Sequence, residues 1–169
     1  MTLHNLNRAQ YYRSFYSGYE TARNEDQRSA LSKGSLVQAD SSALKKAAKT
    51  FSTLYSSENL SGKDILQAIL AFGDTYNNAL ESSSDTGVTR VSQLSKKLKS
   101  LSSKQKKDMA EIGISVKQSG KLSIDKEKLS SASANKVKKI FGNDSEFLKE
   151  LKKYASSLKG ESSTIDLQA

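Results

Sequence analysis

Apolar residues recur at intervals of three and four along most of the chain, and this spacing predicts amphipathic α-helices. Each apolar stripe is narrow and is flanked by serine, lysine and acidic residues, so the helices are expected to share one thin core. The segments with this pattern are about residues 3–31, 40–55, 62–81, 88–101 and 147–158, with a short one after Asp125.

Residues that commonly begin or end helices mark the boundaries between the first three of these segments. Gly34 offers a natural stop, because glycine readily adopts the left-handed conformation that ends many helices. Either Asp40 or Ser41 can cap the second helix through a side-chain oxygen. Ser61 followed by Asp64 resembles a capping box and predicts the start of the third helix.

The apolar pattern changes to alternation between residues 112 and 125. Ile112, Ile114 and Val116 alternate with polar residues, and so do Leu122 and Ile124 after a polar turn that contains a glycine. This arrangement predicts a short β-hairpin. Two strands alone are only marginally stable, so the apolar face of the hairpin is expected to rest on helices.

The predicted fold is therefore mainly α, an antiparallel helical hairpin or bundle with one small β-hairpin at about residues 112–125. Three regions are expected. An aromatic-rich helix occupies residues 1–35, a helical domain with the hairpin occupies residues 36–160, and a disordered polar tail occupies residues 161–169.

Composition limits the chemistry and the compartment. The chain has 169 residues, of which 36% are hydrophobic and 27% charged, and it has neither proline nor cysteine. The lack of proline favours uninterrupted helices, and the lack of cysteine excludes disulfides and cysteine-based zinc sites. No apolar run has the length of a signal peptide or a membrane span, so residence in the cytoplasm is the default expectation.

The net charge of +9 is unevenly distributed. Residues 88–160 contain 18 basic and 7 acidic side chains, a net charge of +11. Such asymmetry indicates either an anionic partner or a solvated lysine-rich surface. The lysines best placed to contact a polyanion are Lys96, Lys97, Lys99, Lys104, Lys106 and Lys107.

Nucleic acid is the alternative partner that these lysines suggest. Two observations weigh against it. The basic half has a single arginine, Arg90, for bidentate base contacts. Its three aromatic residues, Phe141, Phe147 and Tyr154, have the spacing of a helical core and not of a stacking platform.

Candidate catalytic chemistry is sparse. The single histidine, His4, lies near the N-terminus, and the sequence places no base beside any of the 30 serines. No metal-ligand cluster, phosphate-binding loop or other cofactor motif occurs. We therefore expect a non-enzymatic protein without a cofactor, a metal or a small-molecule substrate.

Four segments together resemble a known family. They are Phe72-Gly73-Asp74-Thr75-Tyr76-Asn77-Asn78-Ala79-Leu80, Met109-Ala110-Glu111-Ile112-Gly113-Ile114, Gly120-Lys121-Leu122-Ser123-Ile124-Asp125-Lys126-Glu127-Lys128-Leu129 and Val137-Lys138-Lys139-Ile140-Phe141-Gly142. Their order and spacing over residues 65–158 are similar to the C-terminal region of the flagellar filament-capping (hook-associated) proteins. The large middle domains of that family have no counterpart in this chain.

The resemblance implies a structural protein that packs its helices against itself or against flagellar subunits. It also implies a flagellar, extracellular location if the chain is exported by the flagellar route. The side chains that would form the packing surfaces are Phe147, Leu151, Tyr154 and Leu158, with Tyr12, Phe15, Tyr16 and Tyr19 as a second surface. Tyrosine is common at interfaces, but a helix folded onto its own core explains the same cluster equally well.

Overall fold

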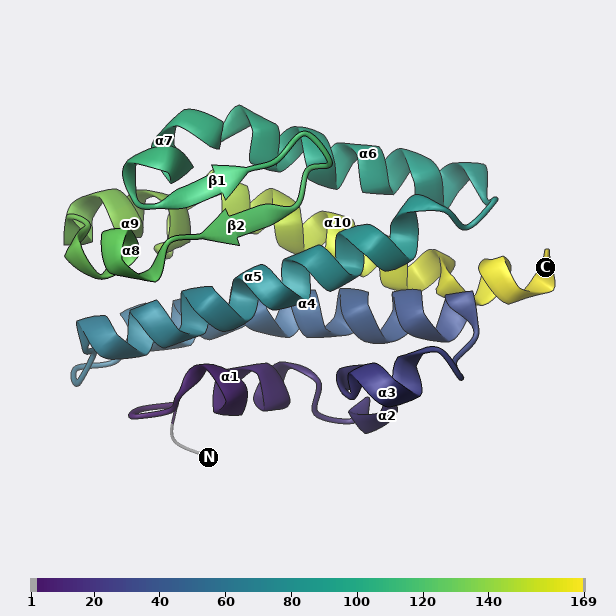
Figure 1. The fold of residues 1–169 in the computed structure, drawn as a ribbon, viewed down its shortest axis with the longest axis horizontal. Helices are drawn as coiled ribbons and strands as arrows, with labels where there is room; N and C mark the ends of the chain where they lie inside the picture. Colours follow the sequence, from purple (N-terminus) through teal and green to yellow (C-terminus); the bar gives the residue numbers. More distant parts are fainter. Residues whose placement is uncertain (1–2, 169) are drawn as a thin grey trace.

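The computed structural model describes residues 3–168 and is mainly α-helical with one β-hairpin, as the sequence predicts (Figure 1). The elements are α1 (Arg8–Phe15), α2 (Glu20–Arg23), α3 (Glu25–Arg28), α4 (Lys33–Tyr55), α5 (Gly62–Ser84), α6 (Thr89–Lys104), α7 (Lys106–Glu111), β1 (Ile114–Val116), β2 (Leu122–Ile124), α8 (Lys126–Ser131), α9 (Ala134–Phe141) and α10 (Glu146–Leu167).

The long helices α4, α5 and α10 form the centre of the molecule. Helix α4 packs most extensively against α10 and then against α5, and α6 lies against both α5 and α10. Helix α1 packs against α5 and α4 on the side that is opposite the hairpin (Figure 1). An aromatic cluster of Phe51, Phe72, Phe141 and Phe147 joins α4, α5, α9 and α10, with ring centroids 4.9–6.4 Å apart.

The start of α4 differs from the sequence prediction. The Ser32 side chain accepts a hydrogen bond from the Ser35 N–H, so the helix begins at Lys33 and runs through Gly34 instead of stopping there. Asp40 consequently lies inside the helix and is fully buried. The prediction for α5 is confirmed, because Ser61 caps it by accepting from the Asp64 N–H.

The prediction of a single helix within residues 1–35 is wrong. The structure has three short helices there, α1 to α3. Gly18 has a φ of +88°, a left-handed conformation that ends the first of them shortly after Phe15. The Asn24 side chain then accepts from the Asp26 N–H and starts α3 in a new direction.

The hairpin is confirmed, with β1 antiparallel to β2 and Val116 opposite Leu122. The side-chain amide of Asn77 on α5 donates to the Leu122 carbonyl at 2.9 Å and accepts from the Leu122 N–H at 2.8 Å. This pair of bonds replaces the strand partner that β2 lacks on its outer edge. The hairpin is therefore fastened to α5 by hydrogen bonds between a side chain and the strand backbone, as well as by its apolar face.

The prediction of a disordered tail at residues 161–169 is also wrong over the described residues, because α10 continues to Leu167. Leu158, Ser162 and Ile165 extend the buried stripe of that helix at spacings of four and three. The Asp166 carboxylate accepts hydrogen bonds from the Gly34 N–H and the Ser32 hydroxyl at the start of α4. Polar composition misled the prediction, since the buried positions are few but regularly spaced.

A glycine permits the close approach of α4 to α10. A Cβ atom at Gly34 would lie 2.6 Å from the Ser162 carbonyl oxygen and 2.5 Å from an Asp166 carboxylate oxygen. We expect Gly34→Ala to lower the free energy of unfolding by about 1–3 kcal/mol, the usual result of overpacking. Gly160→Ala on α10 is the matched control. Its Cβ meets nothing, and it should raise stability by about 0.5–1 kcal/mol because alanine favours helix.

Urea denaturation followed by far-UV circular dichroism measures both glycine variants. Opposite signs for the two variants support close packing of the two helices. Equal gains in stability would show that α4 and α10 separate easily at this point.

Candidate functional site

The aromatic and leucine side chains proposed as packing surfaces lie mostly inside the chain. Five are buried, namely Phe15, Tyr16, Phe147, Leu151 and Leu158, and three are half-buried, namely Tyr12, Tyr19 and Tyr154. Helices α4 and α5 supply the intramolecular partners that cover the buried five. These five are therefore not available on the surface of this fold, which corrects the expectation from the resemblance.

A buried ionic network explains the polar ends of the N-terminal aromatics. The Tyr16 hydroxyl donates to Asp40 at 2.6 Å, and two nitrogens of Arg28 donate to the same carboxylate at 2.8 Å each. Burial, followed by the nearby carboxylate, raises the pKa of the Tyr16 hydroxyl. The hydrogen bond to Asp40 raises the pKa of Arg28. This network ties α1 and α3 to α4 and is structural.

The six lysines proposed for polyanion contact are all exposed, and they follow α6 and the start of α7. Lys97 lies over the ring of Tyr154, with its Nζ 5.9 Å from the ring centroid. Lys96 and Lys99 line a small hollow between α6 and the hairpin turn. The lysines of α6 are thus divided between the flank that faces the hairpin turn and the flank that faces α10.

His4 lies in a contact set that sequence spacing did not reveal. Its Nε2 atom lies 2.8 Å from Ser57 Oγ, and its Nδ1 atom lies 3.5 Å from the Asp64 carboxylate. Burial opposes the charged form of Asp64, but hydrogen bonds from the Ser61 hydroxyl and the Asn5 N–H, together with the nearby His4, lower the pKa of its carboxyl.

This contact set has the residue types of a hydrolase triad but different geometry. The contact between His4 and Asp64 is longer than the hydrogen bond that orients a catalytic imidazole. The Asp64 carboxylate instead accepts from the Ser61 hydroxyl at 2.8 Å and the Asn5 N–H at 2.7 Å. We assign the set a structural role: it fastens the N-terminal segment to the loop between α4 and α5.

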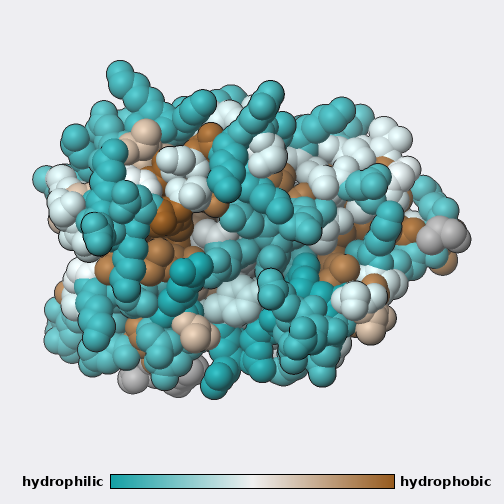
Figure 2. Space-filling model, viewed as in Figure 1, coloured by the Kyte–Doolittle hydropathy of each residue, from teal (hydrophilic) through white to brown (hydrophobic). Residues whose placement is uncertain are grey.

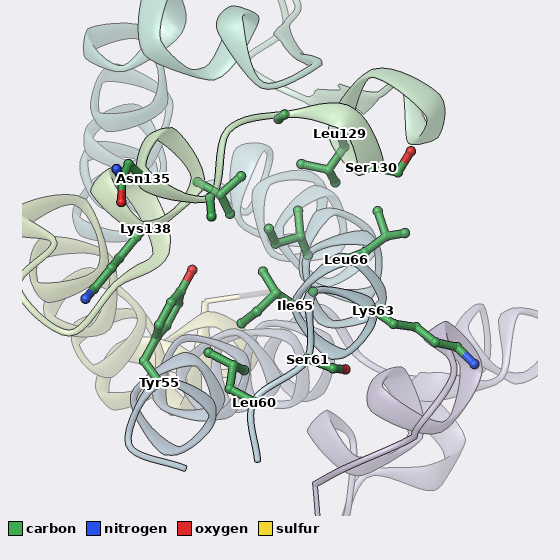
Figure 3. A pocket seen from close by; sticks show the side chains of 15 residues that line it. Tyr55, Leu60, Ser61, Lys63, Ile65, Leu66, Leu129, Ser130, Asn135 and Lys138 are labelled. Carbon is green, nitrogen blue, oxygen red and sulfur yellow. The ribbon is translucent and has the colours of Figure 1, made fainter. Parts of the chain in front are cut away.

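An apolar groove of about 710 Å³ opens beside that loop (Figure 3). One wall is the α4–α5 connection and the first turns of α5, and the other is α8, α9 and the link between them. Its apolar lining consists of Leu60, Ile65, Leu66, Ile69, Leu129, Ala132, Ala134 and Val137. Leu60 and Leu66 are half-buried, so part of their surface is open to a partner.

The charged residues that line the groove are both basic. They are Lys63 and Lys138, and neither is paired with a carboxylate among residues 3–168. Lys138 stands on the α9 wall and Lys63 on α5, and the ammonium groups of both are directed away from the apolar side chains of the groove (Figure 3). Apolar atoms also show through the hydrophilic surface between α5 and α8 in the view of Figure 2. An apolar floor with a basic rim is suited to an amphipathic segment that carries acidic residues.

Other kinds of site find less support in the part of the chain that the structure describes. Among residues 3–168, no group of three or more histidine, cysteine, aspartate or glutamate side chains could hold a metal ion. No described helix is both long and apolar enough to cross a membrane. The groove is therefore the strongest candidate for a functional surface.

Comparison with known proteins points to one family. The family model described as "Flagellar hook-associated protein 2 C-terminus" matches residues 36–169, which include the β-hairpin and all the residues that line the groove. The segment with α1 to α3 lies outside the match. No curated protein and no solved structure matches the chain.

Proposed function

This chain belongs to the flagellar hook-associated protein 2 C-terminus family, and from that premise we propose that it is a non-catalytic docking protein of the flagellar axial structure. The family supports a structural role related to the filament cap. The finer proposal is that the groove between α5 and α8–α9 holds an amphipathic helix of a flagellar subunit.

The single observation that carries this proposal is the groove itself, because the remaining large apolar side chains are largely covered within the chain. Helices dock into such grooves through two or three apolar side chains spaced by three and four residues. Leu60 and Leu66 offer half-buried surface for those anchors. Lys138 at the rim selects for a segment with an acidic flank.

A second copy of this chain is the other occupant that the family suggests. Size-exclusion chromatography with light scattering distinguishes the two possible occupants of the groove. It is run first on the chain alone and then on mixtures with flagellin and the other axial proteins of the same cell. Complex formation with an axial protein supports the proposal, and a dimer alone assigns the groove to self-association. A chain that stays monomeric and binds none of these proteins contradicts the proposed function.

We expect Leu66→Glu to weaken binding of the axial partner by at least about tenfold, because it places a charge against the apolar side chain that Leu66 would contact. Leu36→Glu is the matched control. Leu36 is also half-buried and also lies in the first turns of a long helix, but at the end of α4 away from the groove.

Isothermal titration calorimetry measures the partner affinity of both variants, and circular dichroism checks that each is folded. A similar loss of affinity in both variants would remove the groove from the binding surface.

A further inference from the structure

A second hollow, of about 300 Å³, lies between the end of α5, the middle of α6 and the turn of the β-hairpin. Apart from Leu80, the residues that line it are polar: Ser84, Ser92, Ser95, Lys96, Lys99 and Ser119. Two of its side chains are cationic and none is acidic. The hollow therefore gathers hydrogen-bond donors and positive charge at one place.

Helix periodicity explains why α6 supplies four of these residues. Positions 92, 95, 96 and 99 are separated by three, one and three residues and lie on one face of the helix. Val91, Leu94 and Leu98 occupy the neighbouring face and are buried in the core. The core contacts of α6 therefore fix which face it turns toward the hollow.

The donors of the hollow are largely unused within the chain. Among residues 3–168, the hydroxyls of Ser92 and Ser95 make no hydrogen bond, although Ser95 is only 5% exposed. Lys96 and Lys99 form no ion pair with a described carboxylate. The nearby Glu81 is already paired with Lys121 at 2.7 Å. Neither hydroxyl is among the fully buried polar atoms that lack a partner within the described residues, so both remain accessible to a ligand or to water.

The far wall of the hollow is held in place. A Cβ atom at Gly120 would lie 2.7 Å from Lys99 Cγ and 3.1 Å from Leu80 Cδ2, so the turn sits directly on the Lys99 stem. Gly120 has a φ of +89°, which the turn requires. The hydrogen bonds of Asn77 to Leu122 fasten the same hairpin to α5. The hollow is therefore formed before any ligand arrives, which lowers the entropic cost of binding.

We propose that this hollow is a binding site for a small phosphate-like oxyanion, either free phosphate or the head of a phosphomonoester. Lys96 and Lys99 supply the charge, and the Ser92 and Ser95 hydroxyls donate to the oxygens of the anion. The proposal is independent of the groove, because the hollow is formed at the opposite end of α5 and by none of the residues that line the groove.

Titration of the isotope-labelled full chain with inorganic phosphate, followed by amide NMR at constant ionic strength with chloride as the balancing anion, tests the site. We expect saturable shifts confined to the amides of residues 92–99 and 117–121. The variant K96Q/K99Q should weaken binding by at least about tenfold, since hydrogen bonds to a charged ligand are strong.

Two further variants separate a specific site from general charge attraction. K104Q/K106Q removes the same charge from exposed lysines outside the hollow and should change the affinity by less than about twofold. Ser95→Ala keeps every charge and should still weaken binding by about tenfold. Shifts that never saturate, or equal losses in the two double-lysine variants, would overturn the proposal.

A parallel titration with O-phosphoserine identifies the source of the anion. Tighter binding of phosphoserine than of phosphate assigns the hollow to a phosphomonoester, and the reverse order assigns it to the free ion. Absence of saturable binding to both compounds contradicts the site.

Discussion

Phe72→Ala is expected to lower the free energy of unfolding by about 3–5 kcal/mol, the usual cost of truncating a buried phenylalanine. Phe72 is fully buried at the centre of the aromatic cluster. Its ring centroid lies 5.8 Å from that of Phe51, 5.4 Å from that of Phe141 and 6.3 Å from that of Phe147. The substitution leaves a cavity among α4, α5, α9 and α10 and removes three edge-to-face contacts at once.

Chemical denaturation in urea gives the size of this effect. Leu167→Ala is the control, because Leu167 is 84% exposed and its truncation should change stability by less than about 0.5 kcal/mol. If Phe72→Ala cost no more than the control, the aromatic cluster would not be the centre of the core.

Asp40→Ala should be almost as damaging, at about 3–5 kcal/mol, because it removes one partner of a buried ion pair. The Asp40 side chain is fully buried, whereas 17% of the Arg28 side chain is exposed. Without the carboxylate, the guanidinium of Arg28 and the hydroxyl of Tyr16 lose their common acceptor inside the protein. We expect α1 to α3 to detach from α4 before the rest of the chain unfolds.

An exposed pair of the same chemistry provides the comparison. Arg8 donates two hydrogen bonds to Asp74, but the Arg8 side chain is 52% exposed and the Asp74 side chain 38%. Asp74→Ala should therefore cost at most about 1 kcal/mol. Hydrogen exchange measures both variants residue by residue. Similar protection of residues 8–28 in the two variants would contradict a central role for Asp40.

The amino-acid pattern predicted the elements whose signals are local. The cap at Ser61 and the alternation around Gly120 depend on residues only a few positions apart, and both α5 and the hairpin follow them. The predictions of a single N-terminal helix and of a disordered tail failed for a different reason. The left-handed Gly18 and the contact of Asp166 with Gly34 depend on the backbone and on tertiary packing, which periodicity does not report.

The candidate sites show the same limit. The groove brings Leu60 and Leu66 together with Leu129 from a distant segment, and no spacing in the sequence relates them. The lysine-rich half was visible in the sequence, but only the turn at Gly120 singles out Lys96 and Lys99 from the other lysines. Conversely, Phe147 and Leu151 looked like surface anchors because sequence does not show that α4 covers them.

The pairing of α4 with α10 also determines when the molecule can fold during synthesis. The two helices that contact each other most are separated by α5 to α9, so their contact closes a long loop and must form late. While the ribosome is still translating residues 56–145, the apolar face of α4 has no α10 to cover it. A slow codon placed just before α10 would prolong that aggregation-prone interval, whereas the same codon placed inside α2 would not.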